Sequence, residues 1–290
     1  MKNKIQNPPI LITGMHRSGT TLLVKLLMKL GYFPGYKLDN NLESIFFQRV
    51  NEWLMKRAGG AWDYPLPIKN LFNSTSLKKQ IIKFLLDEMS SLRFSEYSGK
   101  NKKYNKNIWG WKDPRSVFTI DLWKEIFPDL KLIIIRRNGI DVANSLFKRQ
   151  MYNLKNGMNP YFINSFKKRI KNAIRPIESF NFQSCRCTTL QGCFELWEEY
   201  QNEADNLYMK FNRNKLYICY EDLLLDPENT VGQLKQFLPK NIDTKGNLDI
   251  INELNSKRAF AFKNDNNLHD FYLRVKDRKL MKKYGYNDLL

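Results

Sequence analysis

Residues 14–21, GMHRSGTT, combine glycines, hydroxyl groups and an arginine in a pattern that suits anion binding. Gly14 and Gly19 let the backbone turn so that its N–H groups converge on a ligand, and a helix beginning at Thr20 would add its positive end. Side chains that can bind the same anion are Arg17, Ser18, Thr20 and Thr21. The segment therefore predicts a site for a phosphate or sulfate group.

This loop differs from the phosphate-binding loop of nucleotide hydrolases, which ends in Gly-Lys-Ser or Gly-Lys-Thr. Thr20 follows Gly19 directly, and the loop contains no lysine. Nucleotide hydrolysis also needs magnesium, which an acidic residue at a strand end usually holds. The apolar run 132–135 ends instead in Arg136 and Arg137, a basic edge that repels a metal ion and attracts a second phosphate.

A second anion site is predicted beside the first. Ser145 stands roughly two turns into the helix expected after Arg137, where its hydroxyl group can face the same anion. Two anion sites at neighbouring strand ends suggest a nucleotide with phosphate at both its 5′ and 3′ positions. An alternative stays open, because Glu221 and Asp222 also follow an expected strand and could hold a metal ion. That alternative is a magnesium-dependent P-loop kinase or NTPase.

The elements that must position these residues alternate along the chain. The expected strands are Ile10–Thr13, Ile108–Trp111, Leu132–Ile135 and Leu216–Cys219. The expected helices are Thr20–Leu30, Leu42–Lys56, Leu77–Leu92, Val117–Phe127, Asp141–Met151, Phe162–Ile177, Phe194–Phe211, Glu228–Phe237 and Phe271–Lys283. This alternation predicts an α/β fold, a P-loop-type parallel sheet flanked by helices on both faces. Ligands of such sheets bind outside the carboxyl ends of the strands, where the loop and the basic edge fall.

Length and composition favour one domain over residues 1–290, with helical insertions near 40–105 and 152–211. The 48 basic and 29 acidic residues give a net charge of +19, which attracts anionic partners. The basic runs 100–106, 167–171 and 276–283 are scattered, and a solvated surface is favoured for each. The basic face of 162–177 could instead hold an acidic polysaccharide. A basic nucleic-acid-binding protein is the non-enzyme alternative, although no RNA-binding motif accompanies the charge.

The expected location is the cytoplasm. No apolar run approaches the length of a membrane span, and the first such run is too short for a secretory signal. Cysteines occur at 185, 187, 193 and 219, and we expect reduced thiols. A zinc site is less favoured because the two histidines, His16 and His269, lie far from them in sequence. A disulfide stays open as the third interpretation.

Four blocks, in order along the chain, carry a resemblance to a known family. They are GMHRSGTT, WGWKDPR followed by FPDLKLIIIRRNGIDVANS, YEDLLLDPENT and LMKKYGY. Together they resemble the signatures of the sulfotransferase superfamily, from about Pro9 to Tyr286, whereas 60–105 and 152–190 match nothing. The resemblance implies transfer of a sulfuryl group from 3′-phosphoadenosine 5′-phosphosulfate (PAPS), with 3′-phosphoadenosine 5′-phosphate as product and no metal required. It implies a hydroxyl acceptor, with a carbohydrate favoured.

The resemblance also assigns roles to single residues. It implies that Arg17–Thr21 bind the 5′-phosphosulfate and that Arg137 and Ser145 bind the 3′-phosphate. Lys112 stands where a basic residue stabilises the transferring group, and Tyr220 where an aromatic ring packs near adenine. Two further donor-site residues are expected in the loop, Gly14 and His16.

Three departures separate the chain from the steroid- and phenol-sulfating members and favour the bacterial and Golgi-type branches. Leu22 stands where those members carry an aromatic residue that stacks on adenine. Lys112 is followed by Asp-Pro and not by Thr-His, which removes their histidine base. Their terminal Arg-Lys-Gly phosphate loop has only a weak substitute in Lys257-Arg258.

The general base that takes the acceptor proton is the least determined role. Glu43 is the first candidate, because tyrosine-sulfating relatives carry a glutamate in this place. An exposed glutamate that complements a helix dipole is an equally supported interpretation. Asp113 is the second candidate, with ion pairing as its alternative, and His16 is the third. Trp62 lies in a glycine- and proline-marked loop and could stack on a sugar ring, although packing is favoured.

Overall fold

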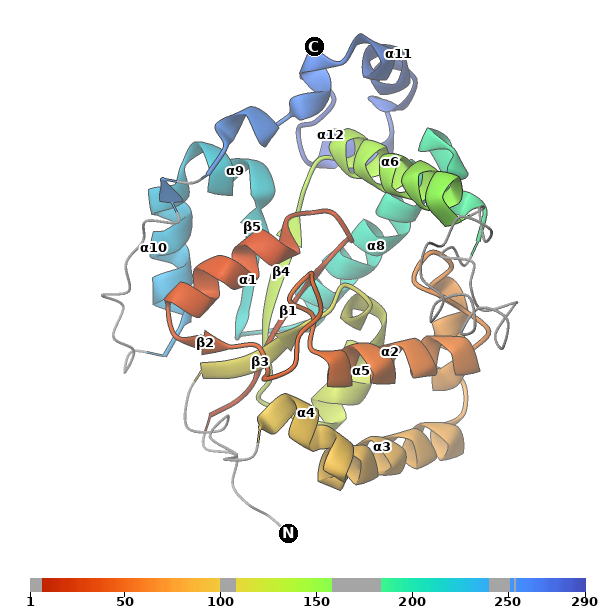
Figure 1. The fold of residues 1–290 in the computed structure, drawn as a ribbon, viewed down its shortest axis with the longest axis vertical. Coiled ribbons are helices and arrows are strands. Elements are labelled where there is room, and N and C mark those ends of the chain that lie inside the picture. The colour runs from red at the N-terminus through yellow and green to blue at the C-terminus, as the bar shows by residue number, and fades with distance from the viewer. Residues whose placement is uncertain (1–6, 100–107, 158–183, 240–250, 253) are drawn as a thin grey trace, which may run out of the picture.

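The structure, a computed structural model, describes residues 7–99, 108–157, 184–239, 251–252 and 254–290. At its centre lies a parallel five-stranded sheet in the order β2-β3-β1-β4-β5 (Figure 1). The strands are β1 (Ile10–Gly14), β2 (Tyr32–Phe33), β3 (Ile108–Lys112), β4 (Lys131–Arg136) and β5 (Lys215–Cys219). Since β1 lies between β3 and β4, the direction of winding reverses at β1, and its carboxyl end opens into the crevice where such sheets bind ligands.

Helices cover both faces of the sheet, as the alternating apolar side chains of its central strands require. Leu11, Leu132 and Ile134 are buried on one face, whereas Ile12 and Ile133 are buried on the other. The first face packs on α2 (Ile45–Arg57), α5 (Ser116–Ile126), α6 (Gly139–Gly157) and α8 (Leu190–Lys210). The second packs on α1 (Thr20–Lys29), α9 (Tyr220–Leu225) and α10 (Pro227–Phe237). The predicted fold class is confirmed.

Most expected elements form within a few residues of their predicted bounds. The remaining helices are α3 (Thr75–Ser90), α4 (Ser95–Ser98), α11 (Asn266–Val275) and α12 (Lys279–Lys283). Helices α2 to α4 form between β2 and β3, within the insertion expected near 40–105. The expected helix 162–177 lies outside the described residues. The single-domain assignment stays a prediction.

Two expectations about the elements were wrong, and one strand was missed. The last helix is two, α11 and α12, because Arg278 has extended backbone with ψ of 147° between them. Strand β2 was not expected, since two residues are too few to show alternation. Helix α2 begins at Ile45 and not at 42, so Glu43 precedes the helix in place of lying on its first turn. This last difference matters for the active site.

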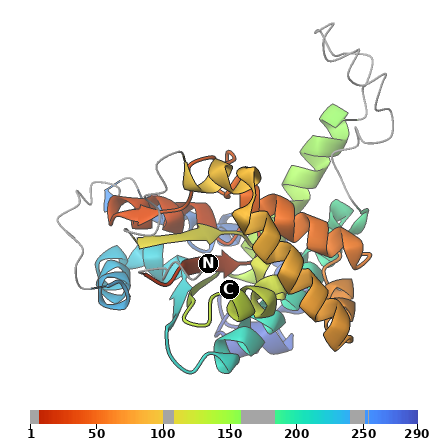
Figure 2. The same cartoon turned by 90° about the horizontal axis from the view of Figure 1, so that it is seen from below.

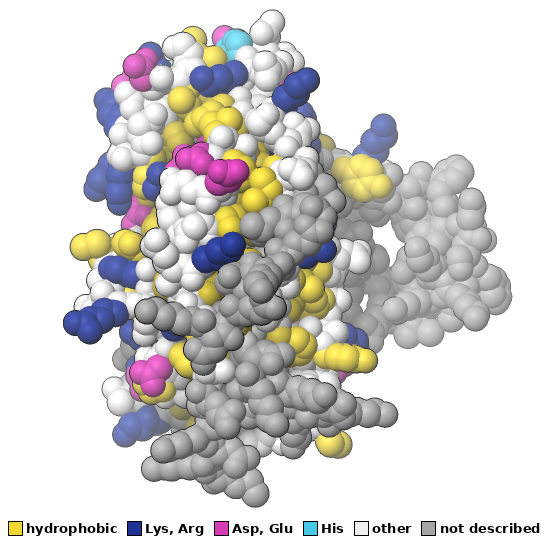
Figure 3. Space-filling model, turned by 90° about the vertical axis from the view of Figure 1, so that its left-hand side faces the viewer, with side chains coloured by type: hydrophobic (Ala, Val, Ile, Leu, Met, Phe, Trp, Pro, Cys, Tyr) yellow, Lys and Arg dark blue, Asp and Glu magenta, His cyan; other side chains and the backbone are white. Residues whose placement is uncertain are grey.

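Helix α6 stands out from the outline of the molecule (Figure 2), and charged side chains are scattered over the face that is seen in Figure 3. Figure 2 shows α6 extending away from the body of the molecule. On the face seen in Figure 3, Lys and Arg side chains are scattered among other types and form no single continuous patch. In the described part of the chain, no helix is both long and apolar enough to cross a membrane.

Candidate active site

The loop after β1 has the backbone geometry that its glycines predict. Gly14 and Gly19 have φ values of +143° and +92°, a region that favours glycine. A Cβ at Gly19 would lie 2.2 Å from the ring of Tyr220, and one at Gly14 would lie 2.2 Å from the carbonyl oxygen of Ile135. Helix α1 then begins at Thr20 with no side-chain cap on its first N–H groups. The loop is therefore held close to β4 and α9. The N–H of Ser18 donates to the carbonyl oxygen of Met15 at 3.2 Å, and the first N–H groups of α1 are available to an anion.

The basic edge after β4 lies beside this loop. Arg137 donates to the carbonyl oxygens of Arg17, at 3.4 Å, and Arg258, at 3.1 Å. It also pairs with Asp141 at 3.1 Å, and its guanidinium lies 4.5 Å from the ring centre of Tyr220. The structure thus brings together residues from three strand ends. Much of the hydrogen-bonding capacity of Arg137 serves to hold them there.

Ser145 lies on the same side as the loop. Its hydroxyl oxygen accepts a hydrogen bond from Nε of Arg17 at 2.8 Å. The two candidate anion sites are therefore neighbours, as the sequence predicted. Arg136 differs from that prediction, because its guanidinium lies 4.6 Å from the ring centre of Tyr284 and does not line the pocket. Only Arg137 of the pair lines the pocket. This is expected because adjacent side chains along a strand point to opposite faces of the sheet.

A pocket with a cavity volume of about 250 Å³ opens where these elements meet. Six of its lining residues are basic and one is acidic; they are Arg17, Lys25, Lys112, Arg137, Arg149, Arg258 and Glu43. The other lining residues are His16, Gly19, Thr20, Thr21, Leu22, Asn41, Pro114, Ser145 and Tyr220. Partial burial, followed by repulsion from Arg258 and Arg137, lowers the pKa of the Arg17 guanidinium. Such crowding of cations favours an anionic ligand.

Several buried polar atoms around the loop have no protein partner among the described residues. They are Nε2 of His16, Oγ of Ser18 and Nε of Arg137. Because buried polar groups are nearly always hydrogen-bonded, these three atoms point to a ligand or to water. His16 and Arg137 line the pocket, whereas Ser18 is fully buried and does not. The unpartnered Nε of Arg137 therefore supports a site for a nucleotide that carries phosphate groups. Thr21 differs, since its hydroxyl group already donates to the carbonyl oxygen of Asn41 at 3.0 Å.

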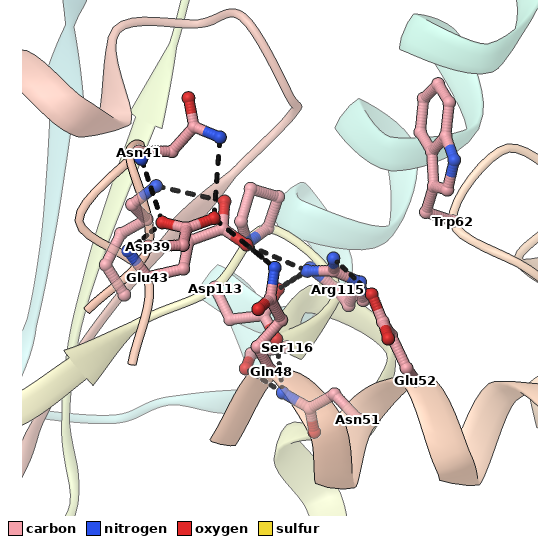
Figure 4. A network of polar contacts seen from close by, with 12 residues as sticks. Asp39, Asn41, Glu43, Gln48, Asn51, Glu52, Trp62, Asp113, Arg115 and Ser116 are labelled. Carbon is pink, nitrogen blue, oxygen red and sulfur yellow. Dashed lines mark hydrogen bonds and ion pairs between the residues drawn. The ribbon is translucent and has the colours of Figure 1, made fainter. Parts of the chain in front are cut away.

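A network of charged side chains reaches the pocket through Glu43 and Lys112 (Figure 4). Glu43 is only 4% exposed, so the interpretation of an exposed helix-dipole partner was wrong. One carboxylate oxygen accepts from Lys112 Nζ at 3.0 Å and the other from Arg115 Nη1 at 2.9 Å. Figure 4 shows Arg115 between Glu43 and Glu52, and it pairs with Glu52 at 3.0 Å. Lys112 is 1% exposed, so both partners of Glu43 are buried charges.

The proton affinity of Glu43 reflects two opposing influences. Burial, and then the nearby Asp113, raise the pKa of the Glu43 carboxyl group above its ordinary value. Lys112 and Arg115 act in the opposite direction without cancelling that rise. A carboxylate with a raised pKa that lines a pocket has the properties of a general base.

Both carboxylate oxygens of Asp113 accept hydrogen bonds from protein groups, and the residue does not line the pocket. It is fully buried, and its Oδ1 accepts from the backbone N–H of Arg115 at 2.9 Å and from its Nη1 at 2.7 Å. Its Oδ2 accepts from Asn51 at 2.8 Å. These contacts match the ion-pair interpretation of Asp113 and leave Glu43 as the carboxylate that faces the pocket.

His16 and Trp62 pack together at the edge of the pocket. The imidazole of His16 is 9% exposed and contacts the indole of Trp62 edge-on, with ring centres 5.0 Å apart. Burial, followed by repulsion from Arg115 and other cations, lowers the pKa of His16 well below its ordinary value. His16 is therefore neutral at pH 7. Trp62 does not line the pocket, and the guanidinium of Arg149 lies 4.5 Å from its ring centre, which matches a packing role.

Sequence reasoning missed three pocket residues, Lys25, Asn41 and Arg149, and undervalued Arg258. Arg149 was not singled out, although it follows Ser145 by one helical turn on α6 and so lies on the same face. Asn41 was missed because it lies in a loop with no periodic pattern. Arg258 was treated as a weak substitute for a phosphate loop, yet it lines the pocket beside Arg17. Its segment is held there because Asp141 accepts from two backbone N–H groups of 261–262.

Glu221, one of the two acidic residues considered for a metal ion, is engaged in hydrogen bonds within the protein. Glu221 is 1% exposed and accepts from the backbone and side-chain N–H groups of Asn138, both at 2.9 Å, and from Tyr286 at 3.2 Å. Within the described ranges, no group of three or more His, Cys, Asp or Glu side chains could hold a metal ion. The four cysteines are free thiols. Glu221 therefore anchors the turn after β4 to the C-terminal segment.

Comparison with known proteins identifies the family. The profile of the sulfotransferase family matches residues 8–242. A sulfotransferase domain from the curacin biosynthetic pathway is 17% identical with a TM-score of 0.43, over 93% of this chain and 92% of that one. A sulfotransferase from Alicyclobacillus acidocaldarius is 16% identical with a TM-score of 0.44, over 86% and 90%. No curated protein matches the sequence. Because the family profile covers most of its length, the chain belongs to the sulfotransferase family.

Proposed function

We propose that this sulfotransferase moves a sulfuryl group from PAPS to a hydroxyl group, and that a carbohydrate is the acceptor. One observation carries the proposal. The loop after β1 and the Arg137–Ser145 edge open into one cationic pocket, whose wall also holds the buried Glu43–Lys112 pair. A nucleotide with phosphate groups at its 5′ and 3′ positions would contact the loop and the Arg137–Ser145 edge. The acceptor would contact the Glu43–Lys112 pair.

The donor end supplies binding and orientation. The N–H groups of the loop and the Arg17 guanidinium bind the 5′ end, while Arg137 and Ser145 bind the 3′-phosphate. The ring of Tyr220, held against Gly19 and Arg137, lies where adenine would pack. PAPS supplies the activated sulfuryl group when it is bound. The protein contributes positioning and fixed positive charge, which stabilise charge on the leaving oxygen.

Glu43 and Lys112 act at the transferring group. The acceptor oxygen forms the new S–O bond, its proton passes to the Glu43 carboxylate, and the bond from sulfur to the 5′-phosphate oxygen breaks. Lys112 neutralises charge on the sulfuryl oxygens. Because burial favours the protonated form of Glu43, its ion pairs with Lys112 and Arg115 act in the opposite direction and favour the ionised form that accepts the proton.

The lining of the pocket favours a hydrophilic acceptor. Its few apolar members include Leu22 and Pro114, whereas charged and hydroxyl side chains make up most of the rest. Steroid or phenol acceptors need an extended apolar surface, and pockets for such ligands are lined mainly by apolar and aromatic groups. A carbohydrate, which presents many hydroxyl groups, suits this lining better.

Transfer of radiolabel tests the proposal. The protein is incubated with radiolabelled PAPS and a panel of oligosaccharides in the presence of a chelator, and labelled products are separated. We expect label on a carbohydrate without added metal. Phosphoryl transfer from magnesium ATP, with no transfer from PAPS, would favour the kinase alternative instead. Salt-sensitive affinity for DNA or RNA that saturating 3′-phosphoadenosine 5′-phosphate leaves unchanged would favour the nucleic-acid alternative.

A further inference from the structure

Arg149 is a half-buried cation in the pocket wall. Within the described part of the chain no carboxylate pairs with it, and the carboxylate of Glu43, which lines the same pocket, pairs with Lys112 and Arg115 instead. Burial, followed by repulsion from Arg17, lowers the pKa of the Arg149 guanidinium, and the attraction of Glu43 and Asp63 does not offset this. A guanidinium in such a place gains from any anion that enters the pocket.

The surroundings of Arg149 fix where that anion would sit. Its guanidinium lies 4.5 Å from the ring centre of Trp62, which holds it from behind. Trp62 in turn contacts His16, which lines the pocket and whose buried Nε2 has no partner among the described residues. Arg149 and His16 therefore both line the pocket and both contact Trp62.

The register of α6 separates this place from the proposed donor site. Ser145 and Arg149 are one turn apart on the same helix face, about 5–6 Å along it. Ser145 contacts Arg17 at the proposed donor end, so Arg149 marks the next position along the pocket. It is also near enough to His16 to depress the pKa of that imidazole. The donor site already has Arg17, Arg137 and Arg258 for its phosphate groups.

We propose that Arg149, supported by Trp62 and assisted by His16, binds a carboxylate carried by the sugar acceptor, as in a uronic acid. The inference rests on the proposed function and adds the acceptor class. It makes Arg149 a specificity residue and assigns it no part in the chemical step. Its charged hydrogen bonds would select an anionic sugar over the neutral sugar of the same shape.

The test compares two sugars that differ only in this group, methyl β-D-glucuronide and methyl β-D-glucoside. Their dissociation constants are measured by NMR titration on protein saturated with 3′-phosphoadenosine 5′-phosphate. We expect the wild type to bind the glucuronide roughly tenfold more tightly or better, the usual effect of a charged hydrogen bond. Arg149→Gln should remove the preference and leave glucoside and nucleotide binding unchanged. Arg149→Lys, which keeps the charge, should retain part of it.

Lys148→Gln is the matched control, because it removes one positive charge from the neighbouring position of α6, where the side chain is 67% exposed. It should keep the preference. Equal binding of the two sugars by the wild type would overturn the inference whether or not the variants fold. Weaker nucleotide binding in Arg149→Gln would also overturn it, by placing Arg149 at the donor. Failure of the nucleotide itself to bind would instead count against the proposed function.

Discussion

The two walls of the pocket use charge in opposite ways. At the donor end, the loop and the basic edge present cations, among them Arg17 and Arg137, and the Nε of Arg137 has no partner among the described residues. At the opposite wall, each carboxylate oxygen of Glu43 already accepts from a buried cation. The first arrangement is built to take an anion from outside. The Glu43 carboxylate is already paired with Lys112 and Arg115. Such pairing suits a group that must gain and lose a proton while it stays in position.

The largest expected effect on turnover comes from substitution of Glu43. Glu43→Gln should lower turnover by roughly 10²–10⁴, the usual contribution of a positioned base, and leave binding of 3′-phosphoadenosine 5′-phosphate unchanged. Glu52→Gln is the matched control, since Glu52 also pairs with Arg115 but does not line the pocket. It should keep near-normal turnover. Equal losses in both variants would mean that the network matters only for structure.

The pH dependence sharpens the same point. A base must be ionised to act, so turnover should fall as the pH drops through the pKa of Glu43. Since burial raises that pKa, the acid limb should lie above the pH at which an ordinary glutamate titrates. The limb should disappear in Glu43→Gln. A limb that persists there would assign the proton transfer to another group.

Arg17→Ala should produce the next largest effect, at the donor end. Charge on the leaving oxygen grows as the bridging bond breaks, so Arg17 should contribute more to the transition state than to the bound donor. We expect turnover to fall roughly tenfold to a hundredfold, the range of a lost charged hydrogen bond, with a smaller loss of nucleotide affinity. Weaker binding with unchanged turnover would make Arg17 an anchor only.

Ser145→Ala should have the smallest effect and the most selective one. Loss of one neutral hydrogen bond should weaken 3′-phosphoadenosine 5′-phosphate by about threefold to tenfold and leave AMP nearly unchanged. Arg137→Ala should weaken the same nucleotide further. It would also disturb the pocket, because Arg137 holds Arg17 and Arg258 through their carbonyl oxygens. Equal weakening of AMP in Ser145→Ala would show that the 3′-phosphate lies elsewhere.

The same contrast explains what the sequence could predict. The loop and the β4 edge are contiguous segments whose glycines, arginines and strand ends carry local patterns, so their meeting in one crevice follows from parallel-sheet topology. The environment of Glu43 depends on contacts with Lys112 and Arg115, which lie far along the chain. No local pattern encodes such pairs. Arg149 was missed although its spacing of one helical turn from Ser145 places it on the same face of α6.

The central claim is that the pocket binds a nucleotide with phosphate at both the 5′ and 3′ positions. Calorimetric titration with 3′-phosphoadenosine 5′-phosphate, AMP and magnesium ATP tests it most directly, with chelator present for the first two. We expect 3′-phosphoadenosine 5′-phosphate to bind at least roughly tenfold more tightly than AMP without metal, because Arg137 and Ser145 would contact its 3′-phosphate. Equal affinity for the two, or tighter binding of magnesium ATP, would contradict it.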